Sequence, residues 1–196
     1  MQAVLLAEPS AVLVKALAER VSKKPVDPPG LTDHRWLYAP PELVQQRIQE
    51  SIDYRKAHGG GGWVILASGD PIGLITVLVE DTVAETFSFI CADAQNRGIA
   101  TAARAGVLTL LANDPDVRRV ASTARPASPS SAVSRRLGYS FVGMEVRHHP
   151  DHGDVVLERY EVALGNWRPP KGVTPARLAP NSELPPGNCG LTLPSS

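Results

Sequence analysis

The ten residues AQNRGIATAA, from Ala94 to Ala103, have the composition of a site that could bind an anion. They follow the apolar run TFSFIC and lead into RAGVLTLL, so we interpret the segment as a turn from a strand into a helix that begins near Gly98. The first N–H groups of a helix have no intrahelical acceptor, and the helix dipole is positive at that end. A glycine at this point lets a phosphate approach the backbone. The segment therefore predicts a phosphate-binding turn.

Two familiar nucleotide-binding loops are excluded at this position. No Gly-Lys-Ser or Gly-Lys-Thr follows Gly98, so the segment is not a P-loop, and it lacks the three glycines of a dinucleotide fingerprint. A strand-to-helix turn with one glycine also occurs in proteins that bind nothing there. The elements around the turn must therefore decide its role.

Hydrophobic periodicity predicts an alternating series of strands and helices around this turn. The expected strands are 3–6, 63–67, 72–81, 84–92, 118–124, 139–149 and 154–164. The expected helices are 9–21, 41–58, 98–113 and 128–138. Ser10 is a suitable N-cap for the first helix, and Pro41 suits the first turn of the second. The segment 25–41 between these two helices is expected to be a loop.

Composition restricts the class of protein. Twenty basic and twenty acidic residues cancel, so no net charge attracts nucleic acid or an anionic membrane. No apolar run approaches the roughly 20 residues of a membrane-spanning helix, and the N-terminus does not resemble a secretory signal. The two cysteines, Cys91 and Cys189, lie in a strand pattern and in a loose tail, which argues against a disulfide framework or a zinc site. We expect a cytoplasmic protein that binds neither nucleic acid nor membranes.

The sequence changes character after Trp167, where it becomes rich in proline and loses its periodicity. We therefore expect one domain at 1–166 and a proline-rich tail at 167–196 that forms no core of its own. Proline-rich segments are extended and lose little entropy on docking. We expect the tail to pack along the domain or on a second copy of the chain, and to be dispensable for ligand binding.

Two motifs resemble one superfamily, the GCN5-related N-acetyltransferases (GNAT). The sequence QNRGIA at 95–100 matches the superfamily loop Q/R-x-x-G-x-G/A at each specified position. The segment PASPSSAVSRRLGYSFVG resembles the Asn-x-x-Ser…Leu-Gly-Phe segment of the ribosomal-protein (RimJ/RimL-like) branch, with Ser130 in the serine position. The order of the elements is similar over residues 3–164. The resemblance implies an α/β (α+β) fold with a mixed, mostly antiparallel sheet of about seven strands and about four flanking helices.

The resemblance also implies an enzyme that transfers acetyl from acetyl-CoA, without a metal, to a primary amine of a small molecule or peptide. Backbone amides of 96–101 would hold the CoA pyrophosphate, the strand at 88–90 would lie along the pantetheine, and an amide near Ile90 would polarise the acetyl carbonyl. The residues that the resemblance assigns to the cofactor are Ser88, Phe89, Ile90, Gln95, Asn96, Arg97, Gly98, Ile99, Ala100, Thr101 and Ser130.

Direct attack by a neutral amine needs a base and a proton donor for the leaving thiolate. Glu85 stands where several branches of the superfamily place a catalytic carboxylate, although an acid at the start of a strand is often simply exposed. His149 falls where the ribosomal-protein branch has a glutamate base, although it also suits a polar hairpin tip. Trp36 and Tyr38 are expected to line the acceptor pocket or to anchor the core.

Two positions depart from the superfamily pattern. Ala127 replaces a common asparagine, and Ser134 stands where many members carry a tyrosine that protonates the thiolate. Ser130 or Ser134 could supply a hydroxyl instead, because they lie four residues apart on one helix face. Both could also be capping or solvated residues. These departures leave two alternatives open: an N-acyltransferase for a longer acyl-CoA, and a catalytically degenerate acyl-CoA-binding regulatory module. A homodimer is compatible with the sequence.

Overall fold

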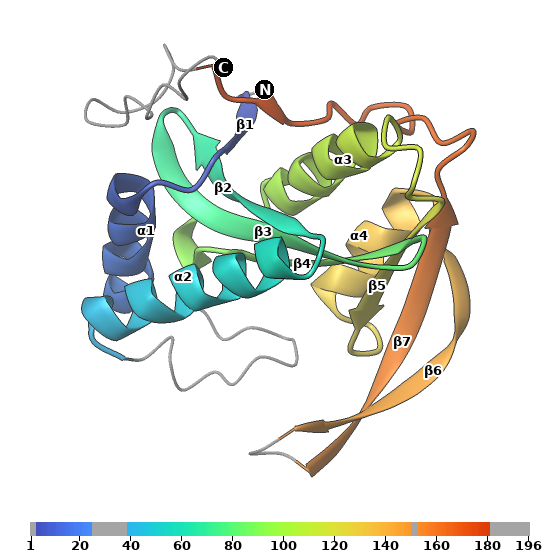
Figure 1. Ribbon diagram of the computed structural model, residues 1–196, viewed down its shortest axis with the longest axis horizontal. Coiled ribbons are helices and arrows are strands. Elements are labelled where there is room, and N and C mark those ends of the chain that lie inside the picture. Colours follow the sequence, from blue (N-terminus) through green and yellow to red (C-terminus); the bar gives the residue numbers. More distant parts are fainter. Residues whose placement is uncertain (1–2, 25–38, 150–152, 181–196) are drawn as a thin grey trace.

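The computed structural model describes residues 3–24, 39–149 and 153–180 of the 196-residue chain. They form one mixed sheet with the strand order β6-β7-β5-β4-β3-β2-β1-β8 and with helices on both faces (Figure 1). The strands are β1 (Val4–Ala7), β2 (Gly61–Ala67), β3 (Asp70–Glu80), β4 (Val83–Ile90), β5 (Arg119–Ala124), β6 (Ser140–His149), β7 (Gly153–Ala163) and β8 (Arg177–Leu178). The helices are α1 (Ala11–Lys23), α2 (Pro41–Ala57), α3 (Ile99–Leu111) and α4 (Pro129–Arg136), with a short 3-10 turn, η2, at Ala92–Ala94.

The element order expected from periodicity is confirmed, with ends that differ by no more than two residues. Ser10 caps α1, because its hydroxyl accepts a hydrogen bond from the Leu13 N–H at 3.2 Å. Pro41 occupies the first turn of α2. The expected sheet of about seven strands gains an eighth, β8, which comes from the proline-rich tail and pairs in parallel with β1.

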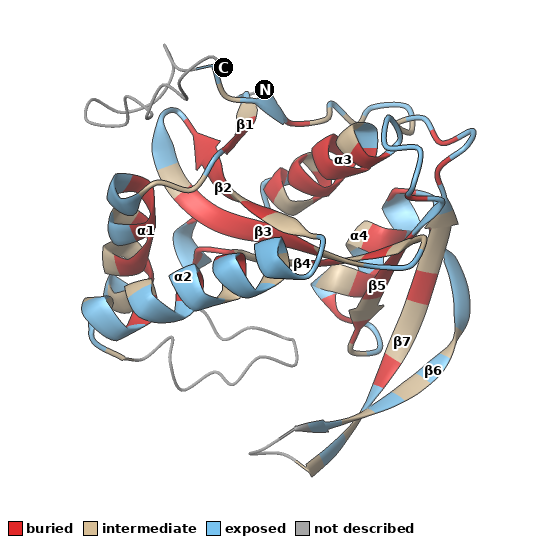
Figure 2. Ribbon diagram, viewed as in Figure 1, coloured by how far each residue is buried: buried red, intermediate tan, exposed pale blue. Residues whose placement is uncertain are grey.

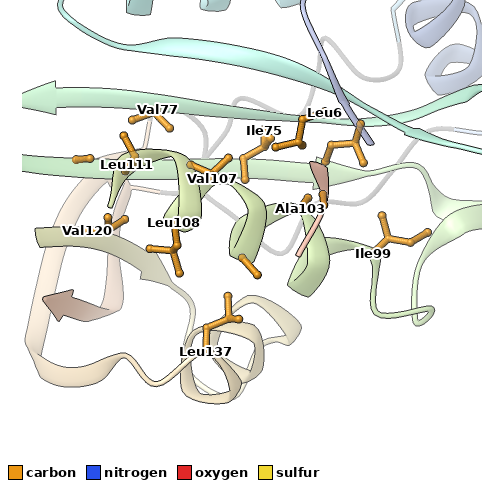
Figure 3. Close-up of a cluster of buried hydrophobic side chains, with 14 of the residues drawn as sticks. Leu6, Ile75, Val77, Ile99, Ala103, Val107, Leu108, Leu111, Val120 and Leu137 are labelled. Carbon is orange, nitrogen blue, oxygen red and sulfur yellow. The ribbon is translucent and has the colours of Figure 1, made fainter. Parts of the chain in front are cut away.

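Apolar side chains form one core on each face of the sheet. α1 and α2 cover one face with residues such as Leu13, Leu17 and Ile52, which are fully buried. α3 and α4 cover the other, where Val107 and Leu108 pack with strand residues (Figures 2 and 3). No helix in the described part of the chain is both long and apolar enough to cross a membrane.

The sheet parts at its centre, between β4 and β5. These two strands run in parallel and pair only where 83–85 faces 119–121. β4 continues to Ile90 and β5 to Ala124, but beyond Glu85 and Ala121 the two strands no longer pair with each other. Within the described structure, the C-terminal half of β4 therefore pairs with the strand β3 on one side but not with β5 on the other. The loop that leaves β4 leads directly into α3.

The first part of the tail packs against α3 and β1. The Ala176 N–H donates to the Ala102 carbonyl at 2.8 Å, and the Ala179 N–H donates to the Leu6 carbonyl at 2.9 Å. Gly106 of α3 faces Ala176 so closely that a Cβ on this glycine would lie 2.4 Å from the Ala176 carbonyl oxygen. Residues up to 180 thus extend the sheet and cover α3.

Candidate functional site

The loop between β4 and α3 is tied to the end of β4 and turns sharply before the helix. After η2, the Gln95 side-chain amide donates to the Ile90 carbonyl at 3.1 Å, which ties the loop to the end of β4. Asn96 and Gly98 have φ values of 58° and 75°, in the left-handed region where asparagine and glycine are least strained. These two residues turn the chain so that it enters α3.

α3 begins with an uncapped N-terminus. Gly98 is its N-cap and provides no side-chain acceptor. The first intrahelical bond runs from the Ala102 N–H to the Gly98 carbonyl at 3.0 Å, so the N–H groups of 99–101 have no intrahelical acceptor. A Cβ on Gly98 would have no heavy atom within 4 Å, so the space beside the helix end is open. These donors and the positive end of the dipole suit an anion such as a phosphate.

Side chains of β4 alternate between the two faces of the sheet. Ala84 and Ile90 belong to the core under α3. Phe89 packs against the core under α1 and α2, and the Arg55 guanidinium of α2 lies over the Phe87 ring at 4.3 Å from its centroid. Glu85 shares this second face, because it is two residues from Phe87.

Glu85 is a partly buried carboxylate with two partners. Its Oε1 accepts from the Thr123 hydroxyl at 3.2 Å and from Arg147 Nη2 at 2.8 Å. Burial lowers the pKa of Arg147, but hydrogen bonds from Arg147 to Glu145 and Glu85 outweigh this and raise it. The side chain of Glu85 is 20% exposed, so it is held in place beside the parting of β4 and β5 and still reaches solvent.

Arg55 adds a second positive charge on this face. Burial lowers the pKa of Arg55, whereas the nearby charge of Glu85 raises it. Its Nε and Nη1 atoms are buried without a hydrogen-bond partner. The sequence pattern predicts no functional role for Arg55 or Arg147. Arg55 could have been noticed because it falls three residues after Ile52, on the buried face of α2.

Three serines on the opposite face have different roles. Ser128 caps α4, because its hydroxyl accepts from the Ser131 N–H at 3.3 Å. The Ser134 hydroxyl is fully buried and accepts from Arg104 Nη1 at 2.9 Å. Ser130 is only partly buried and accepts from Arg104 Nη2 at 3.4 Å. Of the two expected proton donors, Ser130 is thus the more accessible. Sequence reasoning did not identify Arg104.

The described residues do not include the side chains of three expected site residues, His149, Trp36 and Tyr38. His149 ends β6 opposite Gly153, but its side chain lies outside the described part of the structure. Trp36 and Tyr38 also lie outside the described residues. His148 is exposed and bonds to Asp154 Oδ1 at 3.1 Å. Within the described ranges, no group of three His, Cys, Asp or Glu side chains could hold a metal ion.

The candidate site therefore has three parts around β4. A helix end that suits an anion lies beyond the strand, the Glu85 carboxylate lies on the α1/α2 face, and the Ser130 hydroxyl lies on the α3/α4 face. A proton acceptor and a proton donor on opposite faces suit a group transfer in which the nucleophile arrives on one side and the leaving group departs on the other.

Comparisons with known proteins relate this fold to solved structures. A search of curated proteins gives no match. Among solved structures, the fold is similar to that of RimL, a ribosomal L7/L12 alpha-N-protein acetyltransferase in complex with coenzyme A. That match has a TM-score of 0.71 and 17% identity, and covers 82% of this chain and 94% of that one. The microcin C7 self-immunity acetyltransferase MccE, in complex with acetyl-CoA and AMP, has a TM-score of 0.73 and 13% identity, with 82% and 92% covered.

A third similar structure is Mycobacterium smegmatis RimJ in complex with CoA-disulfide, with a TM-score of 0.65 and 19% identity, covering 83% of this chain and 85% of that one. At such identities these structures show a shared fold. The family model of the acetyltransferase (GNAT) domain matches residues 27–140, which is more than half of the chain. The resemblance read from the two sequence motifs is confirmed, and the chain belongs to the GNAT acetyltransferase family.

Proposed function

We propose that the protein transfers an acetyl group from acetyl-CoA to a primary amine. The observation that carries the proposal is the uncapped end of α3 at Gly98, next to the stretch of β4 where its pairing with β5 has ended, in a chain of the GNAT family. The similar structures that contain CoA or acetyl-CoA support the choice of cosubstrate. The similar ribosomal-protein acetyltransferases favour a peptide amine as the acceptor, with a small-molecule amine as the other candidate.

The chain offers separate contacts for the two ends of the cosubstrate. The backbone N–H groups of 96–101 would hold the pyrophosphate, helped by the positive end of the α3 dipole. The printed pairing of β4 with β5 ends at Glu85, so the pantetheine would lie along the β5 side of β4 at 88–90 and bond to its backbone there. A backbone amide near Ile90 would then polarise the acetyl carbonyl.

Glu85 and Ser130 would handle the protons. The amine nitrogen forms its bond to the acetyl carbon and loses a proton, directly or through water, to Glu85; His149 is the alternative acceptor. The carbon–sulfur bond breaks, and the thiolate takes a proton from Ser130. Ser134 is a weaker candidate, because its hydroxyl is fully buried and is bonded within the protein.

Two alternatives share the same cosubstrate site. An acyl-CoA-binding regulatory module would explain why Ala127 and Ser134 replace the asparagine and tyrosine of many relatives. An N-acyltransferase for a longer acyl chain would use the same residues with a deeper acyl pocket.

A measurement of free thiol release from acyl-CoA distinguishes the acetyltransferase from the longer-chain acyltransferase and from the regulatory module. The parent protein is assayed with a panel of N-terminal peptides and small primary amines, with acetyl-CoA and longer acyl-CoAs as donors. We expect thiol release that depends on an amine, and a loss of about 10²–10⁴-fold in rate when the general base is removed. Binding of acetyl-CoA without thiol release for any amine would favour the regulatory module.

The same assay identifies the base. Rates of Glu85→Gln and His149→Ala are compared with the parent across pH. If both variants keep the parental rate and profile, neither residue is the base.

We also propose a second copy of the chain as the partner of the β6–β7 hairpin. β6 lies at one edge of the sheet. The hairpin exposes Phe141, Val142, Met144, Val146 and Val156, each 48–61% exposed. A two-stranded ribbon with an apolar face is marginally stable on its own. Antiparallel pairing of two β6 strands about Val146 would place Glu145 of each copy opposite Arg147 of the other, so this register is favoured by charge.

A further inference from the structure

Arg104 is a buried charged side chain that the proposed reaction does not use. It lies in the second turn of α3 and is 3% exposed. Its guanidinium donates to three hydroxyls: Ser134 Oγ at 2.9 Å, Ser122 Oγ at 3.2 Å and Ser130 Oγ at 3.4 Å. Its Nε is buried and has no hydrogen-bond partner. These contacts join α3, β5 and α4 at one point.

No carboxylate compensates this charge within the described residues. Burial lowers the pKa of Arg104, and the only opposing effect, from the Tyr139 phenol, does not outweigh it within the described structure. Burial also raises the pKa of Tyr139 to about 12, so the phenol is neutral near pH 7 and supplies no counter-charge. Replacing an inadequately paired buried charge by an apolar side chain of similar size is often neutral or stabilising. Stability alone therefore does not explain an arginine here.

The Arg104 guanidinium contacts two serines that lie next to the proposed reaction site. Ser122 is the first residue of β5 beyond the pairing with β4, where the two strands part. Ser130 is in the first turn of α4 and is the proposed proton donor. Arg104 thus bonds both to the point where the sheet opens and to the group that would protonate the leaving thiolate.

Hydrogen-bond chemistry restricts the direction of the Ser130 proton. A guanidinium only donates, so Arg104 occupies a lone pair of Ser130 Oγ and the single hydroxyl proton must point elsewhere. The neighbouring Ser134 hydroxyl directs its own proton to the Ser130 carbonyl or to Ser122 Oγ, at 3.2 and 3.4 Å. Within the described structure, Ser130 Oγ makes no hydrogen bond as a donor. Its proton is available to a ligand.

We propose that Arg104 is a positioning residue for the acyl transfer: it holds and polarises the Ser130 hydroxyl so that its proton is directed to the departing sulfur. This inference rests on the proposed function. The proton moves from Ser130 Oγ to sulfur as the carbon–sulfur bond breaks, and solvent restores the serine proton. Arg104 stays protonated throughout.

A double-mutant cycle with Arg104→Met and Ser130→Ala tests the inference. We measure kcat, KM for acetyl-CoA and Tm for the parent, both single variants and the double variant. Ser130→Ala should lower kcat about 100-fold, the lower range for loss of an acid–base group. Arg104→Met should lower kcat roughly 10- to 100-fold, with KM changed by less than about three-fold, because the residue acts through Ser130. The double variant should be no slower than Ser130→Ala by more than about three-fold, because the two residues act as a unit.

A purely structural arginine would give a different pattern. Tm of Arg104→Met should equal or exceed that of the parent, whereas loss of a structural anchor would lower Tm and acetyl-CoA affinity together. Arg135→Met, which removes an exposed arginine from α4, is the matched control and should keep kcat within about two-fold. If Arg104→Met does not fold, Arg104→Lys takes its place in the cycle, with an expected loss of about ten-fold in kcat that depends on Ser130.

Failure of the proposed function and failure of the inference about Arg104 give different results. A parent protein that binds acetyl-CoA but shows no turnover refutes the proposed function. If the parent is active, two results refute the inference about Arg104 and leave the proposed function intact. One is an Arg104 variant that keeps the parental kcat, and the other is a fall in its kcat that multiplies fully with that of Ser130→Ala in the double variant.

Discussion

Replacing Gly106 by alanine tests whether the tail packs against α3 in solution. A Cβ at this position would lie 2.4 Å from the carbonyl oxygen of Ala176 and 3.1 Å from its Cβ. Contacts below 3.0 Å are essentially never seen for real Cβ atoms, so the tail would have to move. Without such a contact, glycine to alanine inside a helix stabilises a protein by about 1 kcal/mol. The sign of the effect therefore reports whether the tail is docked.

The expected magnitude follows from what the tail would lose. A shift of Ala176 would break or lengthen two backbone hydrogen bonds, from Ala176 to Ala102 and from Ala179 to Leu6, each worth about 1 kcal/mol. It would also expose Ala176 and disturb the pairing of β8 with β1. After the gain in helix propensity, Gly106→Ala should destabilise the full-length protein by about 1–2 kcal/mol. This corresponds to a fall in Tm of about 2–8 °C.

The assay is thermal unfolding of Gly106→Ala in two backgrounds. In the chain truncated after Trp167, nothing of the tail remains to collide with the new methyl group. The substitution should there raise Tm by about 2–4 °C. We also expect the truncated protein to bind acetyl-CoA as the full-length protein does. Stabilisation of equal size in both backgrounds would refute the packing of 173–179 on α3.

Three further predictions concern other parts of the chain. Ala127 has a φ of 56°, which strains a residue with a Cβ, so Ala127→Gly should raise Tm by about 2–4 °C, and an unchanged or lower Tm would contradict this. The hydrogen bond from Arg147 holds the pKa of Glu145 below its ordinary value of 4.5, despite the opposing effect of burial. Ionised Glu145 therefore contributes to the free energy of unfolding above about pH 4.5, and this contribution is lost as the pH falls through its lower folded-state pKa. In urea unfolding from about pH 6 to pH 3, the free energy of unfolding of Glu145→Gln should depend less on pH than that of the parent. Val146→Lys should convert a dimeric parent into a monomer in sedimentation experiments, and a parent that is monomeric at high concentration would rule out self-pairing of β6.

Periodicity predicts the elements of this fold well because most of them bury one regular face. The apolar residues Val44, Ile48 and Ile52 recur at helical spacing, and all three are buried in α2. β8 has only two residues within a proline-rich segment, and its partner β1 lies at the other end of the chain. A pairing between segments so distant in sequence leaves no local pattern, so this strand could not be predicted.

For the candidate site, the sequence predicts the local backbone geometry better than the side-chain partners. Gly98 occupies a left-handed N-cap, and this requirement is visible in the sequence as a lone glycine between a strand and a helix. The partners of Glu85 were not predictable, because Thr123 and Arg147 are brought to it by two other strands. Arg104 did leave a signal: it lies between Ala103 and Ala105 and is the one charged residue of α3, where a charge needs an explanation.

Calorimetric titration of acetyl-CoA tests most directly whether the N-terminus of α3 holds the CoA pyrophosphate. Gly98→Glu is compared with Gly172→Glu, because these glycines have φ values of 75° and 79°, and a Cβ added at either would have no heavy atom within 4 Å. Both substitutions thus introduce the same charge and similar strain, but only the first blocks the proposed phosphate site. We expect Gly98→Glu to weaken binding by about 100-fold, which corresponds to the loss of one or two hydrogen bonds to a charged group. Gly172→Glu should bind like the parent, and parental affinity in Gly98→Glu would contradict the assignment of the site.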